Sequence, residues 1–397
     1  MAFAMFHFSL VLGLLLLVVV LSNPSQDFDS GQDFDSIGFR NGGGDGEGIE
    51  VDFRLFHQDY SPPAPPPPPP HPPSVLSCVE DLGGVGSLDT TCQIVSDLEL
   101  TRSVYIEGKG SFYILPNVTV QCVSFGCELA VNVGGNFTMG DGSLIYAGTF
   151  ELVADNVGLG DGSAVDTTGL AGDPPEHTSG TPGRVDGAGG GYGGRGAACL
   201  QDGEKIPEDV WGGDIDGGSK GGGGSGGSIY IKAFKMTGSG RVSASGGTGF
   251  GGGGGGRVSV DVFSRHDQPK IYVHGGNSLG CPANAGAAGT FYDAVPRSLL
   301  VSNYNRSTFT DTPFYEFPQP HMTNVYIRDF GKATVPLLWS RLQVQGQISL
   351  LNCGMLSFGL AHYPMSEFEI LAEELLMSDS ILRVSKGLNI SQGAFDE

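Results

Sequence analysis

The sequence predicts an all-β protein, a right-handed parallel β-helix of the β-solenoid type that carries long Gly-rich loops. The first observation is a repeat: residues 136–143 (NFTMGDGS) return 20 residues later as residues 156–163 (NVGLGDGS). The second is that short apolar runs, rather than long amphipathic segments, separate the turns. A period of this length with short strands is typical of a solenoid, in which each repeat forms one coil. Successive coils would stack about 4.8 Å apart through parallel ladders.

The strands are predicted where apolar and polar residues alternate. Residues 129–133 (LAVNV), 150–154 (FELVA) and 228–234 (SIYIKAF) alternate with a period of two and contain β-branched residues, which favours strands. Residues 368–377 are ambiguous between helix and strand. We expect mostly strand, in parallel coils, from about Val118 onward.

The corners of the coils are predicted at the Gly-Asp-Gly motifs. Gly adopts positive φ without strain and Asp bonds its own backbone, so each motif would turn one corner. With the corners in register, alternate side chains would point into a narrow shared core. The residues expected to stack there are Phe137, Met139, Leu144 and Leu152.

Further repeats indicate coils of unequal length. Residues 226–231 are echoed by residues 255–260, 29 residues on, and residues 150–155 by residues 368–373. We interpret the Gly tracts as loops that project from one solenoid, because strand-like runs continue on both sides of them. A flexible linker between two domains is the alternative. The tracts are residues 187–196, 221–227 and 251–256.

The N-terminal part is predicted to lie outside the solenoid. Residues 1–22 form a secretory signal peptide, with an unbroken apolar run over residues 10–21; an uncleaved signal anchor is the alternative. Residues 23–74 form a disordered acidic and Pro-rich spacer, since the run SPPAPPPPPPHPP favours a stiff polyproline II rod. The β-solenoid domain is then residues 75–397. Nothing at its C-terminal end resembles the cap that a solenoid needs, which indicates truncation there.

Charge and modification motifs favour an extracellular protein. The 397 residues carry a formal net charge of −22, which argues against nucleic acid as a partner because its phosphates require Lys and Arg. Four N-glycosylation sequons and seven cysteines agree with an oxidising, secretory environment. We therefore expect a secreted protein at the cell surface or cell wall. The predicted glycosylated residues are Asn117, Asn136, Asn305 and Asn389.

Three local disulfides are predicted from the positions of the cysteines. One pair brackets a Gly-rich loop, one brackets a short turn, and one joins two Gly-rich loops in which disulfide geometry is easy to reach. Interleaved pairing of the first four cysteines stays open, because the sequence does not fix connectivity. The left-over Cys353 has apolar neighbours and is expected to be a buried, inert thiol; a partner beyond Glu397 is the alternative. The expected pairs are Cys78–Cys92, Cys122–Cys127 and Cys199–Cys281.

Four stretches carry a resemblance to a known group of proteins. They are residues 77–94 (SCVEDLGGVGSLDTTCQI), 136–148 (NFTMGDGSLIYAG), 221–233 (GGGGSGGSIYIKA) and 275–293 (GGNSLGCPANAGAAGTFYD). Together they resemble large plant glycine-rich cell-surface proteins, some labelled receptor-like, over roughly residues 75–397. The resemblance implies that this chain is the N-terminal portion of a longer protein, and it assigns no activity. Membrane spans belong to the C-terminal parts of the longer members and are not carried over.

The sequence lacks the motifs of β-helix enzymes. Polygalacturonases show Asn-Thr-Asp, Asp-Asp, Gly-His-Gly and Arg-Ile-Lys, and none of these strings occurs here. Inverting hydrolases need two carboxylates with room for a water molecule between them. Ser225 lies in a G-x-S-x-G match, but the helix that a nucleophile elbow needs does not follow it. We therefore predict no catalytic residue.

No metal site or cofactor is predicted. Four aspartates lie in Gly-rich turns, where carboxylates and carbonyls suit Ca²⁺, but their spacing differs from the nine-residue period of Ca²⁺-binding β-rolls. We interpret them as turn formers; a Ca²⁺-dependent adhesin is the alternative. The eight histidines lack the H-x-x-x-H spacing of zinc sites. The four aspartates are Asp141, Asp161, Asp214 and Asp216.

Aromatic residues in or beside the Gly loops are candidates for stacking on sugars, although packing across the base of a loop is the commoner role of such residues. The sequence therefore predicts a non-enzymatic extracellular glycoprotein module with a structural or recognition role at the plant cell surface or wall. The alternatives are a carbohydrate-active β-helix enzyme or a polysaccharide-binding protein. The expected partners are cell-wall polysaccharide or another surface protein. The aromatic candidates are Tyr192, Trp211, Tyr230 and Phe250.

Overall fold

A computed structural model describes most of the chain after the Pro-rich run. The described residues are all-β and contain no helix. Accordingly, none of them forms a helix long and apolar enough to cross a membrane. The predicted signal peptide and spacer lie outside the described residues, apart from Ser74. The described ranges are residues 74–75, 77–124, 126–172, 188–199, 222–266, 269–314, 322–335, 341–358 and 369–384.

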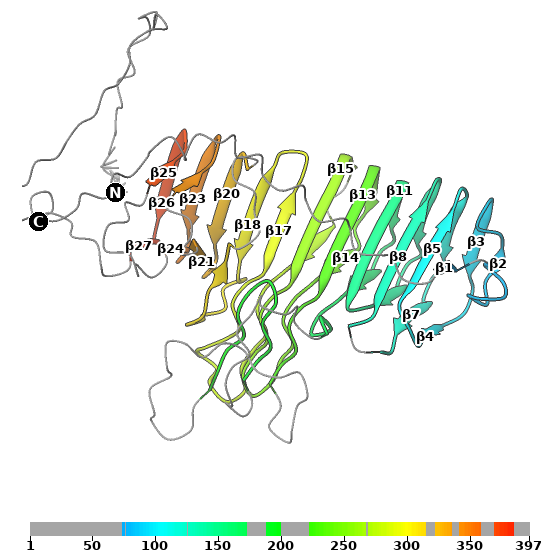
Figure 1. Ribbon diagram of the computed structural model, residues 1–397, viewed down its shortest axis with the longest axis horizontal. Coiled ribbons are helices and arrows are strands. Elements are labelled where there is room, and N and C mark those ends of the chain that lie inside the picture. Colours follow the sequence, from blue (N-terminus) through cyan, green and yellow to red (C-terminus); the bar gives the residue numbers. More distant parts are fainter. Residues whose placement is uncertain are drawn as a thin grey trace, which may run out of the picture. The chain divides into compact units, whose positions relative to one another are not determined.

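The largest sheet has 15 strands, which lie side by side along the long axis of the view in Figure 1. Long strands such as β11 pair along their length with two shorter ones, β8 and β9. The 15 strands are Ser74–Val75 (β1), Val85–Gly86 (β2), Thr91–Ile94 (β3), Val104–Gly108 (β5), Ser111–Ile114 (β6), Glu128–Val133 (β8), Asn136–Met139 (β9), Thr149–Leu159 (β11), Ser228–Gly238 (β13), Arg257–His266 (β15), Thr290–Asp293 (β17), Ser298–Ser302 (β18), Asn324–Arg328 (β20), Gln347–Leu351 (β23) and Glu374–Ser378 (β26).

Three smaller sheets supply the other strands of the coils. The six-stranded sheet contains Leu98–Leu100 (β4), Thr119–Cys122 (β7), Leu144–Tyr146 (β10), Ala164–Asp166 (β12), Arg241–Ser243 (β14) and Lys270–Tyr272 (β16). The four-stranded sheet contains Thr312–Pro313 (β19), Lys332–Val335 (β21), Met355–Phe358 (β24) and Ile381–Val384 (β27). Arg341–Gln343 (β22) pairs with Glu369–Leu371 (β25). Within these three sheets every pairing is parallel.

The sequence repeats align as stacked, parallel coils, so the arrangement is β-solenoid-like. Asn136 pairs with Asn156, and the rest of the 20-residue repeat follows in the same register. Residues 226–231 and 255–260 align likewise, with Ile229 opposite Val258. Parallel pairing begins at Ser74 and Thr91, so the expectation that the coils start near Val118 was wrong. The residues once ambiguous between helix and strand form β25 and β26 where they are described.

The first core runs from Cys78 to Val273. Phe137, Met139 and Leu152 are buried in it, as expected. Leu144 is only half-buried, and its neighbour Ile145, 1% exposed, takes the core position. The predicted core position was therefore wrong by one residue. The inward positions keep their parity through the corner, since Met139, Ser143 and Ile145 are all buried, and Leu144 therefore falls on the outward side.

The direction of the strands reverses between β17 and β18 in the middle of the largest sheet, as it also does between β2 and β3 at its edge. β15 and β17 are parallel, β17 and β18 are antiparallel, and β18 and β20 are parallel again. The buried face changes at the same place. Phe291 lies opposite Val258 and packs against the first core, whereas its neighbour Tyr292 lies opposite Leu299, which is buried in the second core. Paired residues share a face of a sheet, so the two cores lie on opposite faces.

The corners of the two halves use different chemistry. In the first half, Gly142 and Gly162 have φ of 67° and 69°, and the Asp161 amide donates to the Asp141 carboxylate at 2.9 Å. In the second half, two consecutive non-glycine residues adopt positive φ at three corners, one of which is formed by Asp329 and the following residue. The Asn352 amide Nδ2 donates to Asp329 Oδ1 at 2.8 Å. Asn and Asp tolerate this conformation best among non-glycine residues, which explains their place there.

The Gly tracts form a packed bundle that extends from the strands, as Figure 1 shows in green and yellow. We call it the glycine bundle; it comprises residues 188–199, 222–227, 245–256 and 273–289. The hydrogen bonds of one segment go to several neighbours: Gly254 donates to Gly190 at 2.8 Å, and Gly194 donates to Gly255 at 2.7 Å. Strands pair in parallel across each tract, so the tracts are loops of one solenoid rather than linkers between domains.

Close backbone approach, rather than unusual φ, explains the glycines of the bundle. Gly253 donates to the Gly247 carbonyl at 3.0 Å and accepts from the Gly276 amide at 2.7 Å. A methyl group on its Cα would collide with the carbonyl oxygen of Gly224. Here Cα hydrogens face carbonyl oxygens of adjacent segments, a weak but recurring attraction. Any side chain would separate the segments.

Candidate functional site

A cleft of about 300 Å³ lies on the outer face of the largest sheet, over β11, β13, β15 and β17. This face of the sheet points away from the first core. Further along the sheet, the same face packs against the second core. The side chains that matter most in its lining are Glu151, Tyr230, Arg257, Ser259, Tyr292 and Pro313.

One row of paired residues forms the floor of the cleft. Glu151 lies opposite Tyr230, Tyr230 opposite Ser259, and Ser259 opposite Tyr292. The two tyrosines are therefore two strands apart, about 10 Å at the usual strand spacing. Since Ser259 between them is small, the row leaves a slot that two aromatic side chains flank.

Arg257 and the glycine bundle form one side of the cleft. The Arg257 guanidinium lies over the ring of Tyr192, with Cζ 5.1 Å from the ring centroid. The Ser228 hydroxyl donates to the Tyr192 hydroxyl at 3.1 Å. Tyr192 precedes Gly193, which lines the cleft. The bundle thus contributes backbone to a site whose floor is sheet, and the ring of Tyr192 supports Arg257 behind the lining.

The second half of the solenoid closes another side. Pro313 of β19 lines the cleft. The Arg195 guanidinium pairs with the Asp311 carboxylate at 2.7 Å, and the Arg195 amide donates to the Asp311 carbonyl at 3.2 Å. These bonds fix the glycine bundle to the start of the second half. The cleft is therefore bounded by three parts of the chain that are far apart in sequence.

The surroundings of the Tyr230 hydroxyl favour its neutral form. Burial raises the pKa of Tyr230, and the carboxylates of Asp261 and Glu151 raise it further. The neutral phenol both donates and accepts hydrogen bonds. With the Ser259 hydroxyl, the Arg257 guanidinium and the Glu151 carboxylate, the cleft combines aromatic faces with several polar groups, as small-molecule sites usually do.

The cleft brings together two of the four aromatic candidates. Tyr230 is in its lining, and Tyr192 borders it through Arg257. Phe250 lies elsewhere, beside a disulfide in the glycine bundle. Trp211 falls outside the described residues. The sequence analysis missed Arg257, Ser259 and Tyr292. The period-two alternation indicates that these side chains face away from the first core. No local pattern, however, indicates the change of buried face that places Tyr292 at the side of the cleft.

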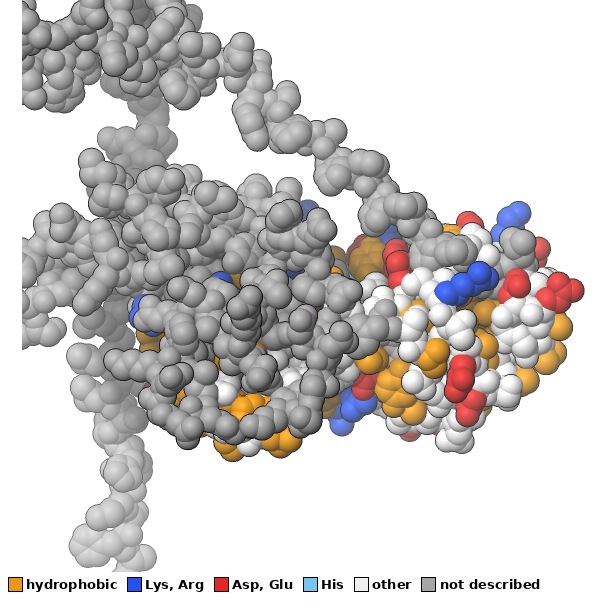
Figure 2. Space-filling model, turned by 60° about the horizontal axis from the view of Figure 1, so that its bottom comes forward, with side chains coloured by type: hydrophobic (Ala, Val, Ile, Leu, Met, Phe, Trp, Pro, Cys, Tyr) orange, Lys and Arg blue, Asp and Glu red, His pale blue; other side chains and the backbone are white. Residues whose placement is uncertain are grey.

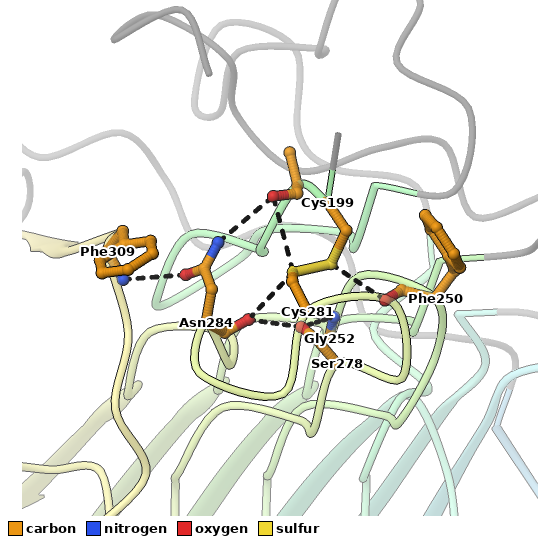
Figure 3. The surroundings of a disulfide bond; sticks show 8 residues. Cys199, Phe250, Gly252, Ser278, Cys281, Asn284 and Phe309 are labelled. Carbon is orange, nitrogen blue, oxygen red and sulfur yellow. Dashed lines mark hydrogen bonds between the residues drawn. A yellow bond between two sulfur atoms is a disulfide. The ribbon is translucent and has the colours of Figure 1, made fainter. Parts of the chain in front are cut away.

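Disulfides join the pairs that the sequence analysis expected. They are Cys78–Cys92, Cys122–Cys127 and Cys199–Cys281. Figure 3 shows the third, which holds two segments of the glycine bundle together. Beside it the Asn284 side chain donates to the Ala198 carbonyl at 3.2 Å and accepts from the Phe309 amide at 2.8 Å. The disulfide thus ties the bundle to itself, and Asn284 ties it to the second half.

Cys353 is exposed, so the expectation of a buried thiol was wrong. It has a φ of 60° at a corner of the second half, beside Asn352. Apolar neighbours in the sequence predicted burial, but a corner residue in the left-handed conformation does not follow the alternation of the strands beside it.

The described sequons lie on the surface. Asn117, Asn136 and Asn305 are all exposed, and Asn389 falls outside the described residues. Asn136 accepts a hydrogen bond from Asn156 at 2.9 Å, and Asn305 accepts one from Asn352 at 2.9 Å. Each of these bonds uses the carboxamide oxygen of the sequon residue and leaves its nitrogen, the atom that a glycan modifies, outside the bond.

Of the aspartates proposed as turn formers, Asp141 accepts from the backbone amide of Asp161, and Asp161 accepts from the side-chain hydroxyl of Ser239. Asp214 and Asp216 fall outside the described residues. Among described residues there is no group of three or more His, Cys, Asp or Glu side chains that would hold a metal ion. In Figure 2 the described acidic and basic side chains lie dispersed among neutral and hydrophobic ones.

No protein-family model, curated protein or solved structure matches this chain. The chemistry of the cleft therefore carries the functional argument.

Proposed function

We propose that this protein is a non-enzymatic extracellular recognition module that binds polysaccharide at the plant cell surface or wall. The observation that carries the proposal is the slot over Ser259, which Tyr230 and Tyr292 flank. The face of a tyrosine ring attracts the polarised C–H groups of a sugar ring, and its hydroxyl bonds the sugar hydroxyls. Arg257 and Glu151 supply further polar contacts at the rim.

The composition of the cleft favours binding without cleavage. Hydrolysis of a glycosidic bond normally uses two carboxyl groups, on either side of the bond. Among the described residues that line the cleft, Glu151 alone carries a carboxylate. A carbohydrate-active enzyme remains the rival function, and its product would be released sugar.

We also propose that the coils form a right-handed β-helix. Crossovers between parallel strands of one sheet are right-handed in nearly all proteins. Reversing the strand direction alone, as the β17–β18 hairpin does, would invert the hand of the second half. Because the buried face changes at the same hairpin, the two inversions cancel and both halves keep one hand.

An extracellular location fits the covalent chemistry. Three disulfides are typical of proteins that fold in an oxidising compartment. The exposed sequons agree with passage through the secretory pathway. Another surface protein is the alternative partner, and it would need more contact area than the slot alone offers.

The test is binding of the full secreted chain to an array of cell-wall polysaccharides, followed by titration calorimetry with oligosaccharides of each positive polymer. We expect binding by the native chain and at least ten-fold weaker binding by Tyr230→Ala and by Tyr292→Ala. Ser259→Trp, which fills the slot, should abolish binding, whereas Ser259→Ala should retain most of it.

Failure of every polysaccharide to bind would refute the proposed function. Release of reducing sugar by the native chain, lost in Glu151→Gln, would favour the enzyme instead. Circular dichroism of each variant separates loss of a contact from loss of the fold.

A further inference from the structure

Two exposed phenylalanines lie on the same sheet as the cleft. Phe234 of β13 is 59% exposed and Phe263 of β15 is 73% exposed. Their rings stack with centroids 5.5 Å apart and planes at 15°. Their neighbours Ala233 and Val262 are buried in the first core, so the fold does not need the two rings for its interior.

The stacked pair continues the outer face on which the cleft lies. Along β13 the outward positions are Tyr230, Lys232 and Phe234, because Ile231 and Ala233 between them are buried. Four strand residues span about 13 Å. The Phe234–Phe263 pair therefore lies about 13 Å along the sheet from the slot, at the place where the ladder between the two strands skips these two residues.

The surface between the two aromatic sites is polar and balanced in charge. Lys232 lies opposite Asp261 on the neighbouring strand. In the cleft, the cation Arg257 and the anion Glu151 offset each other in the same way. The whole chain carries a net charge of −22, which repels a polyanion at long range. The charge of this face therefore suits an uncharged ligand.

We propose that the ligand is an uncharged linear polysaccharide that occupies both sites at once. One segment of the chain enters the slot over Ser259, and a later segment lies across the Phe234–Phe263 pair. The inference rests on the proposed function and extends it, because a monosaccharide or disaccharide would fill the slot but would not reach the phenylalanines. Linking two weak sites through one ligand raises the overall affinity without any new contact in either.

The test uses the full secreted chain and neutral β-1,4-linked glucan, mannan and xylan oligomers, from disaccharides to hexasaccharides. Affinity for the preferred series should rise at least ten-fold between the shortest and the longest oligomer. The double variant F234A/F263A should lose this gain and still bind the short oligomers as the native chain does. Leu279→Ala removes another exposed hydrophobic side chain, 72% exposed in the glycine bundle, and should change nothing.

Oligogalacturonides of the same lengths test the charge argument, and they should bind more weakly than the neutral series. Short oligomers that bind without any gain on lengthening, or a gain that survives F234A/F263A, would refute the extended site while leaving the slot intact. Tighter binding of the charged series would refute the uncharged ligand. If no oligomer or polysaccharide binds, the proposed function fails together with this extension.

Discussion

Tyr292 and Leu299 face each other across the antiparallel β17–β18 hairpin, yet one lines an open cleft and the other is fully buried. They mark the boundary at which the outer face of the first half becomes the inner face of the second. The cleft exists because the sheet remains uncovered on that face up to Tyr292, and the second half then encloses it. The site is thus a product of the topology rather than of a local motif.

The change of buried face predicts opposite sensitivities for two adjacent leucines. Leu299 is 0% exposed in the second core, whereas Leu300 points to the other face and is half-buried. Leu299→Asp should lower the free energy of unfolding by more than about 4 kcal/mol, because it buries an unpaired charge. Leu300→Asp should lower the free energy of unfolding by less than half of the loss expected for Leu299→Asp. Guanidinium unfolding followed by circular dichroism measures both, and equal losses would contradict the face change.

Gly253 should be intolerant of the smallest side chain. Gly253→Ala forces a methyl group against the Gly224 carbonyl, and we expect a loss of about 2–3 kcal/mol, as for overpacked interiors. Gly158→Ala is the matched control, since its added Cβ meets only Thr138 side-chain atoms at 3.5 Å or more. This control should be neutral in the same unfolding assay. A neutral Gly253→Ala would show that the bundle is loosely packed.

The disulfides should contribute unequally to stability. The Cys199–Cys281 bond joins residues 82 apart, which corresponds to about 4.5 kcal/mol in the chain-entropy model. The Cys122–Cys127 bond joins residues 5 apart, worth about 2 kcal/mol. C199S/C281S should therefore lower the unfolding midpoint more than C122S/C127S. Peptide mapping without reduction tests the connectivity first, and a 78–122 crosslink would overturn the local pairing.

The free energy of unfolding should fall as the pH is lowered from about 6.5 to about 4, because the pKa of His274 is lower in the folded protein than in the unfolded chain. Burial lowers its pKa to about 4, and Arg306 adds to this, while the Gly275 carbonyl and Asp166 oppose it. In the unfolded chain the pKa is about 6.5, so between these two values the unfolded state takes up the proton more readily and stability declines with falling pH.

The His274 contribution is at most about 1.4 kcal/mol per pH unit. The rings of Tyr272 and Tyr304 lie beside the imidazole, and Arg306 and Asp166 are the charges that act on it. His274→Asn should flatten the slope of unfolding free energy against pH between about 6.5 and 4 relative to the native chain. An unchanged slope would assign the acid sensitivity to carboxylates instead.

The sequence predicted the stacked coils because the repeat is explicit. The corner motifs at Asp141 and Asp161 recur at a fixed spacing, and parallel ladders require that the two copies align. The sequence also singled out Tyr230 as an aromatic candidate beside a Gly loop, and it lines the cleft. These features depend on local patterns, which a single sequence carries in full.

The sequence did not predict features that depend on how distant strands are connected. The alternation of apolar and polar residues stays the same where the topology of the sheet changes. Phe291 and Tyr292 alternate like any strand pair, and nothing in them reveals that a hairpin will exchange the buried face. Leu144 was misplaced although the sequence carries the signal, because the buried positions stay odd-numbered from Phe137 through the corner to Ile145. Cys353 was misplaced because a corner residue does not follow the alternation of the strands beside it. Ser259 matters only because two tyrosines from neighbouring strands flank it, and its own identity carries no such signal.

The glycine bundle also affects how the protein responds to temperature. Its interior consists of backbone around residues such as Gly253, so unfolding it exposes peptide groups and little apolar surface. Exposed apolar surface raises the heat capacity of the unfolded state, whereas exposed polar surface lowers it. Per residue, the bundle should therefore show a heat-capacity increment well below the usual value of about 12–15 cal/mol/K. The bundle then flattens the stability curve, so that its stability changes less on cooling and on warming than that of the strand cores beside it.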